Sequence, residues 1–427
     1  MIPERGVPHH AAALAGTLQS GTVGHVSYGE NLPLARILMA WELGAGYGHL
    51  GPLLTLSRPL QAAGHHVCFV VRDVAGAEAV LGGSGMPYYA APANFAPSGE
   101  TVLHSFAQIL RSTAFNREDE LRARVRAWQA LYGLLEPDLL VCDHAPTALL
   151  AARGRDIPCV VTGNGFVIPP DVAPLPELRP WEPQDKAVLE AAEAQARDMA
   201  NAVLERTGGG KLSKLADLYN AATPALFTLR ELDNYAALRG DVEYRGILPG
   251  PGGETPRWPA GPGKRVFCYG QPFPSLPEVL ESLSAGPHRT LVYIPKLAPE
   301  LRRHASAYLA FADGLQDMDA VTRECDAALM TNGHSTTAAM LLAGKPVLLL
   351  PQHLEMFLIA NGVQESGAGL SAPGLKREGI INKLERVLQE NSFTDQARAL
   401  AARYPGRDPQ APVQGFQTLV ERLVESR

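Results

Sequence analysis

The chain has 427 residues, enough for two domains of the common size of about 100–200 residues. Hydrophobic residues make up 46% of it and charged residues 19%, a composition that is typical of folded enzymes and excludes extensive disorder. A formal net charge of -6 speaks against a basic surface, so we expect no nucleic acid and no anionic membrane among its partners. No apolar run reaches the length of about 18 residues that predicts a membrane span.

Residues 1–34 precede the first strong strand pattern and predict a poorly structured N-terminal extension. Its apolar stretch at 11–15 is too short for a secretory signal. The five cysteines form no CxxC pair, and their number is odd. We therefore interpret them as buried thiols of a reducing compartment and expect a cytoplasmic protein.

A strand, helix and strand pattern then repeats along the chain and predicts a parallel sheet. Apolar strand-like runs lie at 35–41, 66–71, 138–143, 158–162 and 224–228. Helical spacing lies at 53–60, 121–135, 147–153 and 183–204.

Residues 249–264 are rich in proline and glycine, which excludes a helix or a central strand and predicts a linker. The same α/β pattern restarts after it. Strands are predicted at 265–269, 290–294, 327–330 and 346–350, and helices at 336–342 and 416–424. The prediction is α/β with two doubly wound domains, 35–248 and 265–427, that face each other across a cleft formed by the carboxyl ends of their strands.

His49 follows the first strand in a glycine-rich turn, and Asp143 ends a later strand of the same sheet. A histidine at such a place can act as a general base, and a carboxylate can orient it and stabilise its protonated form. The alternative is that His49 only caps the next helix. Adjacent strand residues point to opposite faces, so at most one of Asp143 and His144 is expected to face His49. His65 and His66 are predicted to be surface residues at a turn.

A second candidate site lies in the C-terminal half, where Thr331–Thr337 connect a short strand to a helix. The backbone N–H groups of a helix start bind phosphate oxygens, although ordinary N-capping would use the same residues. The residues we assign to a phosphate group are Gly333, His334, Ser335 and Thr336. Gln352 and Glu355 follow the next strand and could bind sugar hydroxyls, and Gly270 and Gln271 would line the same cleft.

Asp317-Met318-Asp319 has the Asp-x-Asp form of some metal-dependent transferases, but we interpret Asp317 as the N-cap of a short helix. The scattered histidines and cysteines have no zinc spacing. We therefore expect no metal and no cofactor.

Residues 35–405 resemble the GT-B glycosyltransferases of the UDP-glycosyltransferase and macrolide glycosyltransferase type, most clearly at 44–73, 137–162 and 325–370. The resemblance matches His49 to the catalytic base and Asp143 to the aspartate of its dyad. It implies a GT-B fold with an N-terminal acceptor domain and a C-terminal nucleotide-sugar domain. Such enzymes transfer a sugar from a UDP- or dTDP-type donor to a hydroxyl or similar nucleophile, usually with inversion and without a metal. The nucleotide-sugar is then a co-substrate.

Three positions depart from the family pattern. Thr331 stands where the family has a histidine on the diphosphate, Ala339 where it has a ribose-binding glutamate, and Met356 where it has a sugar-binding glutamine. These departures leave two alternatives open: a non-catalytic nucleotide- or sugar-binding protein of the same fold, and a nucleotide-sugar epimerase.

Overall fold

The computed structural model describes residues 34–44, 47–92, 102–250, 252–331 and 333–426. Of the predicted N-terminal extension it covers only Leu34. Ala45 and Gly46 of the glycine-rich turn and Asn332 of the second candidate site also lie outside the described residues.

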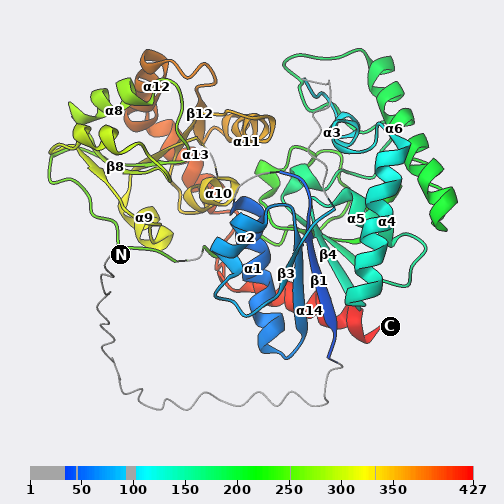
Figure 1. Ribbon diagram of the computed structural model, residues 1–427. Coiled ribbons are helices and arrows are strands. Elements are labelled where there is room, and N and C mark those ends of the chain that lie inside the picture. The colour runs from blue at the N-terminus through cyan, green and yellow to red at the C-terminus, as the bar shows by residue number, and fades with distance from the viewer. Residues whose placement is uncertain (1–33, 45–46, 93–101, 251, 332, 427) are drawn as a thin grey trace, which may run out of the picture. The chain divides into compact units, whose positions relative to one another are not determined.

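Six parallel strands form the first sheet in the order β3-β2-β1-β4-β5-β6 (Figure 1). Their bounds are β1 Arg36–Trp41, β2 His66–Val71, β3 Tyr88–Ala90, β4 Leu139–Asp143, β5 Cys159–Gly163 and β6 Thr223–Leu226. The helices of this half are α1 Tyr47–Ala62, α2 Val74–Leu81, α3 Phe106–Thr113, α4 Glu118–Leu135, α5 Pro146–Ala152, α6 Lys186–Thr207 and α7 Asp217–Asn220, with short 3-10 turns η1 Gly165–Val167 and η2 Arg230–Leu232.

A second sheet of six parallel strands has the order β12-β11-β10-β7-β8-β9. Its strands are β7 Arg265–Tyr269, β8 Arg289–Tyr293, β9 Leu309–Phe311, β10 Ala327–Met330, β11 Val347–Leu349 and β12 Gly369–Ser371. The helical elements that follow the linker are α8 Leu276–Ser284, η3 Pro299–His304, α9 Met318–Glu324, α10 His334–Leu342, α11 Leu354–Glu365, α12 Arg377–Gln389, α13 Asn391–Ala401 and α14 Ala411–Glu425. Two parallel sheets with flanking helices confirm the predicted α/β class.

Both faces of the first sheet are covered, because successive residues of a strand point to opposite sides. In β1, Ile37 and Met39 join the apolar core under α1 and α2, whereas Leu38 and Ala40 join the core under α3 to α6. This arrangement explains why the strands read as continuous apolar runs rather than as alternating ones.

The elements that the sequence analysis did not predict include the short outer strands. β3, β9 and β12 each have three residues and lie at an edge of their sheet. Such a strand is too short to show a period, and its place depends on pairing with a neighbour. The predicted cap of α9 is confirmed, since the Asp317 carboxylate accepts hydrogen bonds from the backbone N–H groups of Asp319 and Ala320.

The last helix does not pack where chain order suggests. The apolar side chains Val413 and Phe416 of α14 join the core of the first sheet, on the side of α1. Leu229 and Leu232, which precede the linker, join the core of the second sheet instead. The chain therefore passes from the first core to the second before the linker and returns to the first core at α14. The described linker residues form no helix and only one isolated bridge, from Glu254 to Gln316.

Two smaller predictions concern single side chains. All five cysteines are free thiols, three of them fully buried. The surface assignment of His65 is wrong. This residue is 4% exposed, and its Nδ1 accepts a hydrogen bond from the backbone N–H of Ala35, the residue that directly precedes β1.

Within the part of the chain that the structure describes, no helix is both long and apolar enough to cross a membrane.

Candidate active site

The structure brings His49 and Asp143 together at the carboxyl end of the first sheet. β1 and β4 are neighbours, and Trp41 at the end of β1 lies opposite Asp143 at the end of β4. The chain leaves β1, turns, and places His49 in the first turn of α1. His49 Nδ1 lies 3.1 Å from Asp143 Oδ1, with side-chain exposures of 16% and 4%. When Nδ1–H donates to the carboxylate, the lone pair of a neutral imidazole is on Nε2, so this geometry orients a base.

The lack of a side chain at Gly44 allows the imidazole of His49 to lie close to the backbone there. Gly44 has φ +87, and a Cβ built on it would lie 2.2 Å from His49 Nε2. Only glycine satisfies both the left-handed backbone and the close approach. The indole of Trp41 stacks on the imidazole with ring centroids 5.4 Å apart, which fixes the plane of the ring.

Two carboxylates affect the protonation of His49. Burial works against the charged imidazolium, but the negative charges of Asp143 and Glu355 outweigh it and raise the pKa of His49 above its usual value. The protonated form is thereby stabilised, which is what a base requires after it has taken a proton.

His144 also reaches His49, contrary to the expectation that only one of the adjacent residues would do so. The strand ends at Asp143, and His144 takes a left-handed backbone with φ 48, so the alternation of strand side chains no longer applies. The ring centroids of His144 and His49 are 6.1 Å apart. Burial, together with the positive charges of His49 and Arg72, lowers the pKa of His144 to about 3, and this imidazole is neutral at physiological pH.

The second candidate site begins at Gly333, with φ +105, and continues into α10 at His334. The first N–H groups of an α-helix have no partner within the helix and carry its positive end. Ser335 is exposed and Thr336 is half-buried at this end. His334 Nε2 lies 2.7 Å from Thr228 Oγ1, just beyond β6, so this imidazole is already engaged with the other half of the chain. Burial lowers the pKa of His334, with Glu355 and Asp233 opposing the effect.

Thr331 connects the two loops at the carboxyl ends of β7 and β10. Its Oγ1 accepts a hydrogen bond from the backbone N–H of Gln271 and donates one to the Gln271 carbonyl at 3.1 Å. Gly270 has φ +146, and a Cβ there would lie 1.9 Å from Thr331 Oγ1. Thr331 therefore holds Gly270 and Gln271 against the candidate phosphate loop.

Glu355, in the first turn of α11, lies near both candidate sites. It accepts a hydrogen bond from Asn164 Nδ2, and its charge acts on both His49 and His334. Asn164 follows β5, beside Asp143, and was not among the predicted residues. Its place at the end of a strand in Gly163-Asn164-Gly165 is the signal that could have identified it. Gln352 is exposed, with no hydrogen bond described for its side chain.

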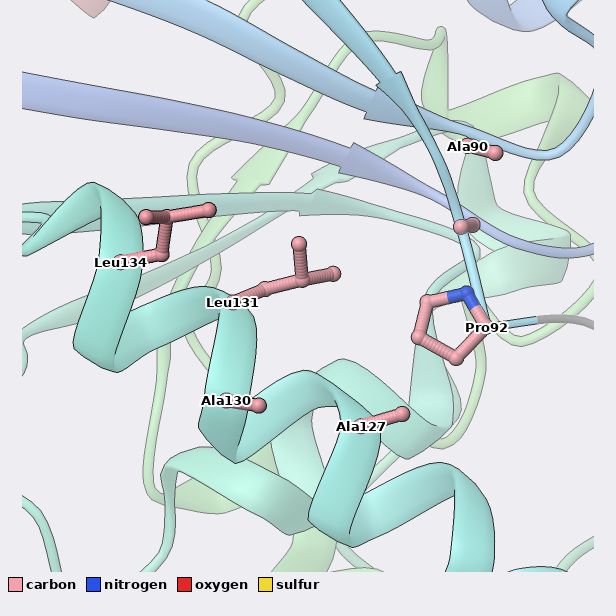
Figure 2. Close-up of a pocket in the computed structure, with 7 residues that line it drawn as sticks. Ala90, Pro92, Ala127, Ala130, Leu131 and Leu134 are labelled. Carbon is pink, nitrogen blue, oxygen red and sulfur yellow. The ribbon is translucent and has the colours of Figure 1, made fainter.

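A separate cavity of about 410 Å³ lies between the end of β3 and α4 (Figure 2). Small and apolar side chains line it: Ala90, Ala91, Pro92, Ala127, Ala130, Leu131 and Leu134. None of the predicted site residues belongs to it, and its lining offers no group for acid–base chemistry.

Comparisons with known proteins show which proteins this chain is similar to, and no family model matches it. It is 22% identical over 371 residues to an uncharacterized glycosyltransferase of Methanosarcina acetivorans, covering 85% of this chain and 90% of the relative. It is 27% identical over 344 residues to the PGL/p-HBAD biosynthesis glycosyltransferase of Mycobacterium tuberculosis, covering 74% and 77%.

Solved structures show the same fold. The glycosyltransferase VinC in complex with dTDP superposes with a TM-score of 0.66 at 17% identity, over 92% of this chain and 100% of that one. The calicheamicin glycosyltransferase CalG4 gives 0.64 at 18% identity, over 92% and 98%. The predicted GT-B fold is therefore confirmed. The curated relatives reported above are named glycosyltransferases, so the chain is similar in sequence to glycosyltransferases and shares the GT-B fold of the solved ones.

Proposed function

We propose that the chain transfers a sugar from a nucleoside diphosphate sugar of the UDP or dTDP type to a hydroxyl of its acceptor. The observation that carries this proposal is the contact of 3.1 Å between His49 Nδ1 and Asp143 Oδ1, which engages one ring nitrogen and leaves Nε2 to act on the acceptor. An oriented imidazole whose second nitrogen is accessible has the form of a general base.

In this mechanism His49 Nε2 takes the proton from the acceptor hydroxyl as its oxygen attacks the anomeric carbon of the donor sugar. The bond to the diphosphate oxygen breaks, and the nucleoside diphosphate leaves. Asp143 stabilises the imidazolium that forms. A single displacement with one base inverts the anomeric centre, so we expect inversion.

The leaving diphosphate would lie at the N-terminal end of α10. Backbone N–H groups at Gly333, His334, Ser335 and Thr336 would bind its oxygens, and the helix dipole would stabilise the developing charge in place of a metal ion. Gly270 and Gln271 would close the other side of this loop, while Gln352 and Glu355 would bind sugar hydroxyls. Two GT-B structures of similar fold, VinC and SsfS6, were solved with thymidine diphosphate, which supports a donor of this class.

The test is sugar transfer from UDP-glucose and dTDP-glucose to a panel of hydroxyl compounds, with wild type and His49→Ala compared in the presence of EDTA. We expect the substitution to lower the transfer rate by about 10²–10⁴-fold, the usual contribution of a general base, while the circular dichroism spectrum stays the same. An unchanged rate would remove His49 from the mechanism. Conversion of the donor to another sugar without any acceptor would favour the epimerase instead.

A further inference from the structure

A buried carboxyl group lies in the turn that leads from β1 to the candidate base. Glu42 directly follows β1 and is 5% exposed. It continues the face of β1 that holds Leu38 and Ala40, both of which belong to the apolar core under α3 to α6. An apolar residue would fill this place at lower cost, because a buried carboxyl group loses its hydration. A residue that packing does not favour, next to a candidate site, points to a role in that site.

Two helices supply the hydrogen bonds that compensate the burial of Glu42. Its Oε2 accepts a hydrogen bond from the backbone N–H of Thr147 at 2.8 Å, and its Oε1 accepts hydrogen bonds from the Thr147 hydroxyl and from Trp128 Nε1. Thr147 follows Pro146, which has no N–H, so the Thr147 N–H is the first that α5 can offer. Glu42 therefore ties the end of β1 both to α4 and to the start of α5.

The start of α5 belongs to the same loop as Asp143. Asp143 ends β4, and the chain passes from it through His144 directly into α5. A second contact joins the same two loops, since the backbone N–H of Leu43 donates a hydrogen bond to the His144 carbonyl at 3.0 Å. The loops that follow β1 and β4 are thus connected at two points, and one of them depends on the side chain of Glu42.

The end of β1 also holds the imidazole of His49. Trp41 and Glu42 are neighbours that point to opposite faces of the sheet, so Trp41 stacks on His49 while Glu42 reaches α4 and α5. Trp41 Nε1 donates a hydrogen bond to the Leu43 carbonyl at 2.6 Å, which keeps the indole against this turn. A displacement of the β1 end would therefore move Trp41 and, with it, the plane of the His49 ring relative to Asp143.

We propose that Glu42 is a positioning residue for the candidate base. By binding Thr147 and Trp128, its carboxyl group fixes the end of β1 against the loop of Asp143 and thereby sets the contact of His49 Nδ1 with Asp143. Glu42 itself touches none of the reacting atoms. Its effect on catalysis rests on the transferase function proposed above, whereas its effect on the contact of His49 with Asp143 is measurable without turnover.

The experiment follows the His49 imidazole by nuclear magnetic resonance in Glu42→Met and Glu42→Gln. Methionine is of similar length and packs well in an apolar core, but it offers no oxygen to Thr147 and Trp128, whereas glutamine keeps one oxygen acceptor. In protein with ¹⁵N-labelled histidine, at a pH above the raised pKa of His49, the wild type should carry the imidazole proton on Nδ1. This resonance is assigned by its absence in His49→Gln.

We expect Glu42→Met to speed the exchange of the Nδ1 proton with water by roughly tenfold, because local opening governs the exchange of a hydrogen-bonded proton. Glu42→Gln should have a smaller effect. A residue that served packing alone would give the reverse order, since methionine suits an apolar core better than an amide does.

The matched control is Glu193→Met. Glu193 in α6 is another buried glutamate, 6% exposed, and its carboxyl group accepts a hydrogen bond from the backbone N–H of Leu175. This variant should leave the His49 resonance and its exchange rate as in the wild type. An unchanged exchange rate in Glu42→Met, or an equal change in Glu193→Met, would overturn the proposal.

A second pair of variants keeps Glu42 and serves if Glu42→Met does not fold. Thr147→Val removes the hydroxyl that donates to Glu42, and Thr147→Ser keeps it. The valine variant should exchange the His49 proton severalfold faster, and the serine variant should restore the wild-type rate. Wild-type exchange in the valine variant would contradict the proposal.

Sugar transfer separates this proposal from the proposed function. With the hydroxyl compound that the wild type glycosylates fastest, Glu42→Met should lower kcat by roughly tenfold to a hundredfold with little change in the KM for donor, because small misplacements of a reacting group cost that much. An altered His49 resonance in Glu42→Met, with no transfer by the wild type, would count against the transferase reaction alone. A wild-type kcat in Glu42→Met would overturn the role of Glu42 in catalysis.

Discussion

The two candidate sites use polar groups in opposite ways. At the end of the first sheet, side chains form the proposed base: Asp143 holds His49 through Nδ1, and Nε2 lies close to the backbone of Gly44. At the end of the second sheet, two side chains are already hydrogen-bonded within the protein. Thr331 bonds to Gln271, and His334 bonds to Thr228. The groups that we propose for the diphosphate there are backbone N–H groups at the start of α10. A base must be a particular side chain, whereas an anion can be bound by backbone, so the second site can tolerate departures in its side chains.

The largest effect should come from closing the space beside His49. Gly44→Ala would place a methyl group where the acceptor hydroxyl must approach, because the added Cβ lies 2.2 Å from Nε2 in the present backbone. We expect sugar transfer to fall by about 10³-fold, comparable to loss of the base. Gly48→Ala is the control in steady-state assays, because a Cβ there meets nothing within 4 Å. Equal rates in both variants would contradict the orientation of His49.

Asp143→Asn removes the charge that holds the proton on His49. We expect kcat to fall by about a hundredfold. The pH profile should also change: a raised pKa of His49 means that the wild-type rate falls as pH drops through that value, into the range where the base is protonated. Without the Asp143 charge, burial dominates and lowers the pKa of His49, so the acidic limb should move to lower pH. A limb that stays in place would assign it to another group.

The backbone site is tested by nucleotide binding. A diphosphate at about 100 times its dissociation constant should stabilise the protein by roughly 2.7 kcal/mol, seen as a higher thermal midpoint for one of UDP, dTDP, GDP, ADP or CMP, with or without EDTA. Gly270→Ala should remove most of the shift, because the added Cβ would lie 1.9 Å from Thr331 Oγ1. Gly374→Ala, where a Cβ meets nothing within 4 Å, should keep it. A full shift in both variants would exclude Gly270 from the site.

The smallest effect concerns Thr331, which bonds to the loop after β7. Thr331→Val removes both hydrogen bonds to Gln271 and should lower the free energy of unfolding by about 1–3 kcal/mol, at roughly 0.5–1.5 kcal/mol for each bond. Chemical denaturation measures this change. If Thr331 acts only through the loop, the KM for donor should rise severalfold with kcat little altered. A large fall in kcat would instead give Thr331 a direct role in the reaction.

Residue patterns were sufficient to predict the parallel sheets, the central strands and the pairing of His49 with Asp143. Buried parallel strands are continuous apolar runs, which made the central strands recognisable. Neighbouring parallel strands end at the same edge of a sheet, so Asp143 could be placed near the turn that follows the first strand and leads to His49. Gly44, Asn164 and Thr228 were not predicted. Each acts through a contact with a residue distant in sequence or through a close approach of backbone, and no local pattern encodes either.

His144 shows where the reasoning from strands stops. Alternation of side chains holds only while the backbone stays extended, and the left-handed φ of His144 turns its ring toward His49. By itself, the sequence determined the fold class and the candidate base, because periodicity and strand order are local properties of the chain. Only the tertiary structure decided that Glu355 lies near His49 and that α14 packs on the first sheet. These facts depend on packing between segments far apart in the chain, where burial sets both the contacts and the charge states.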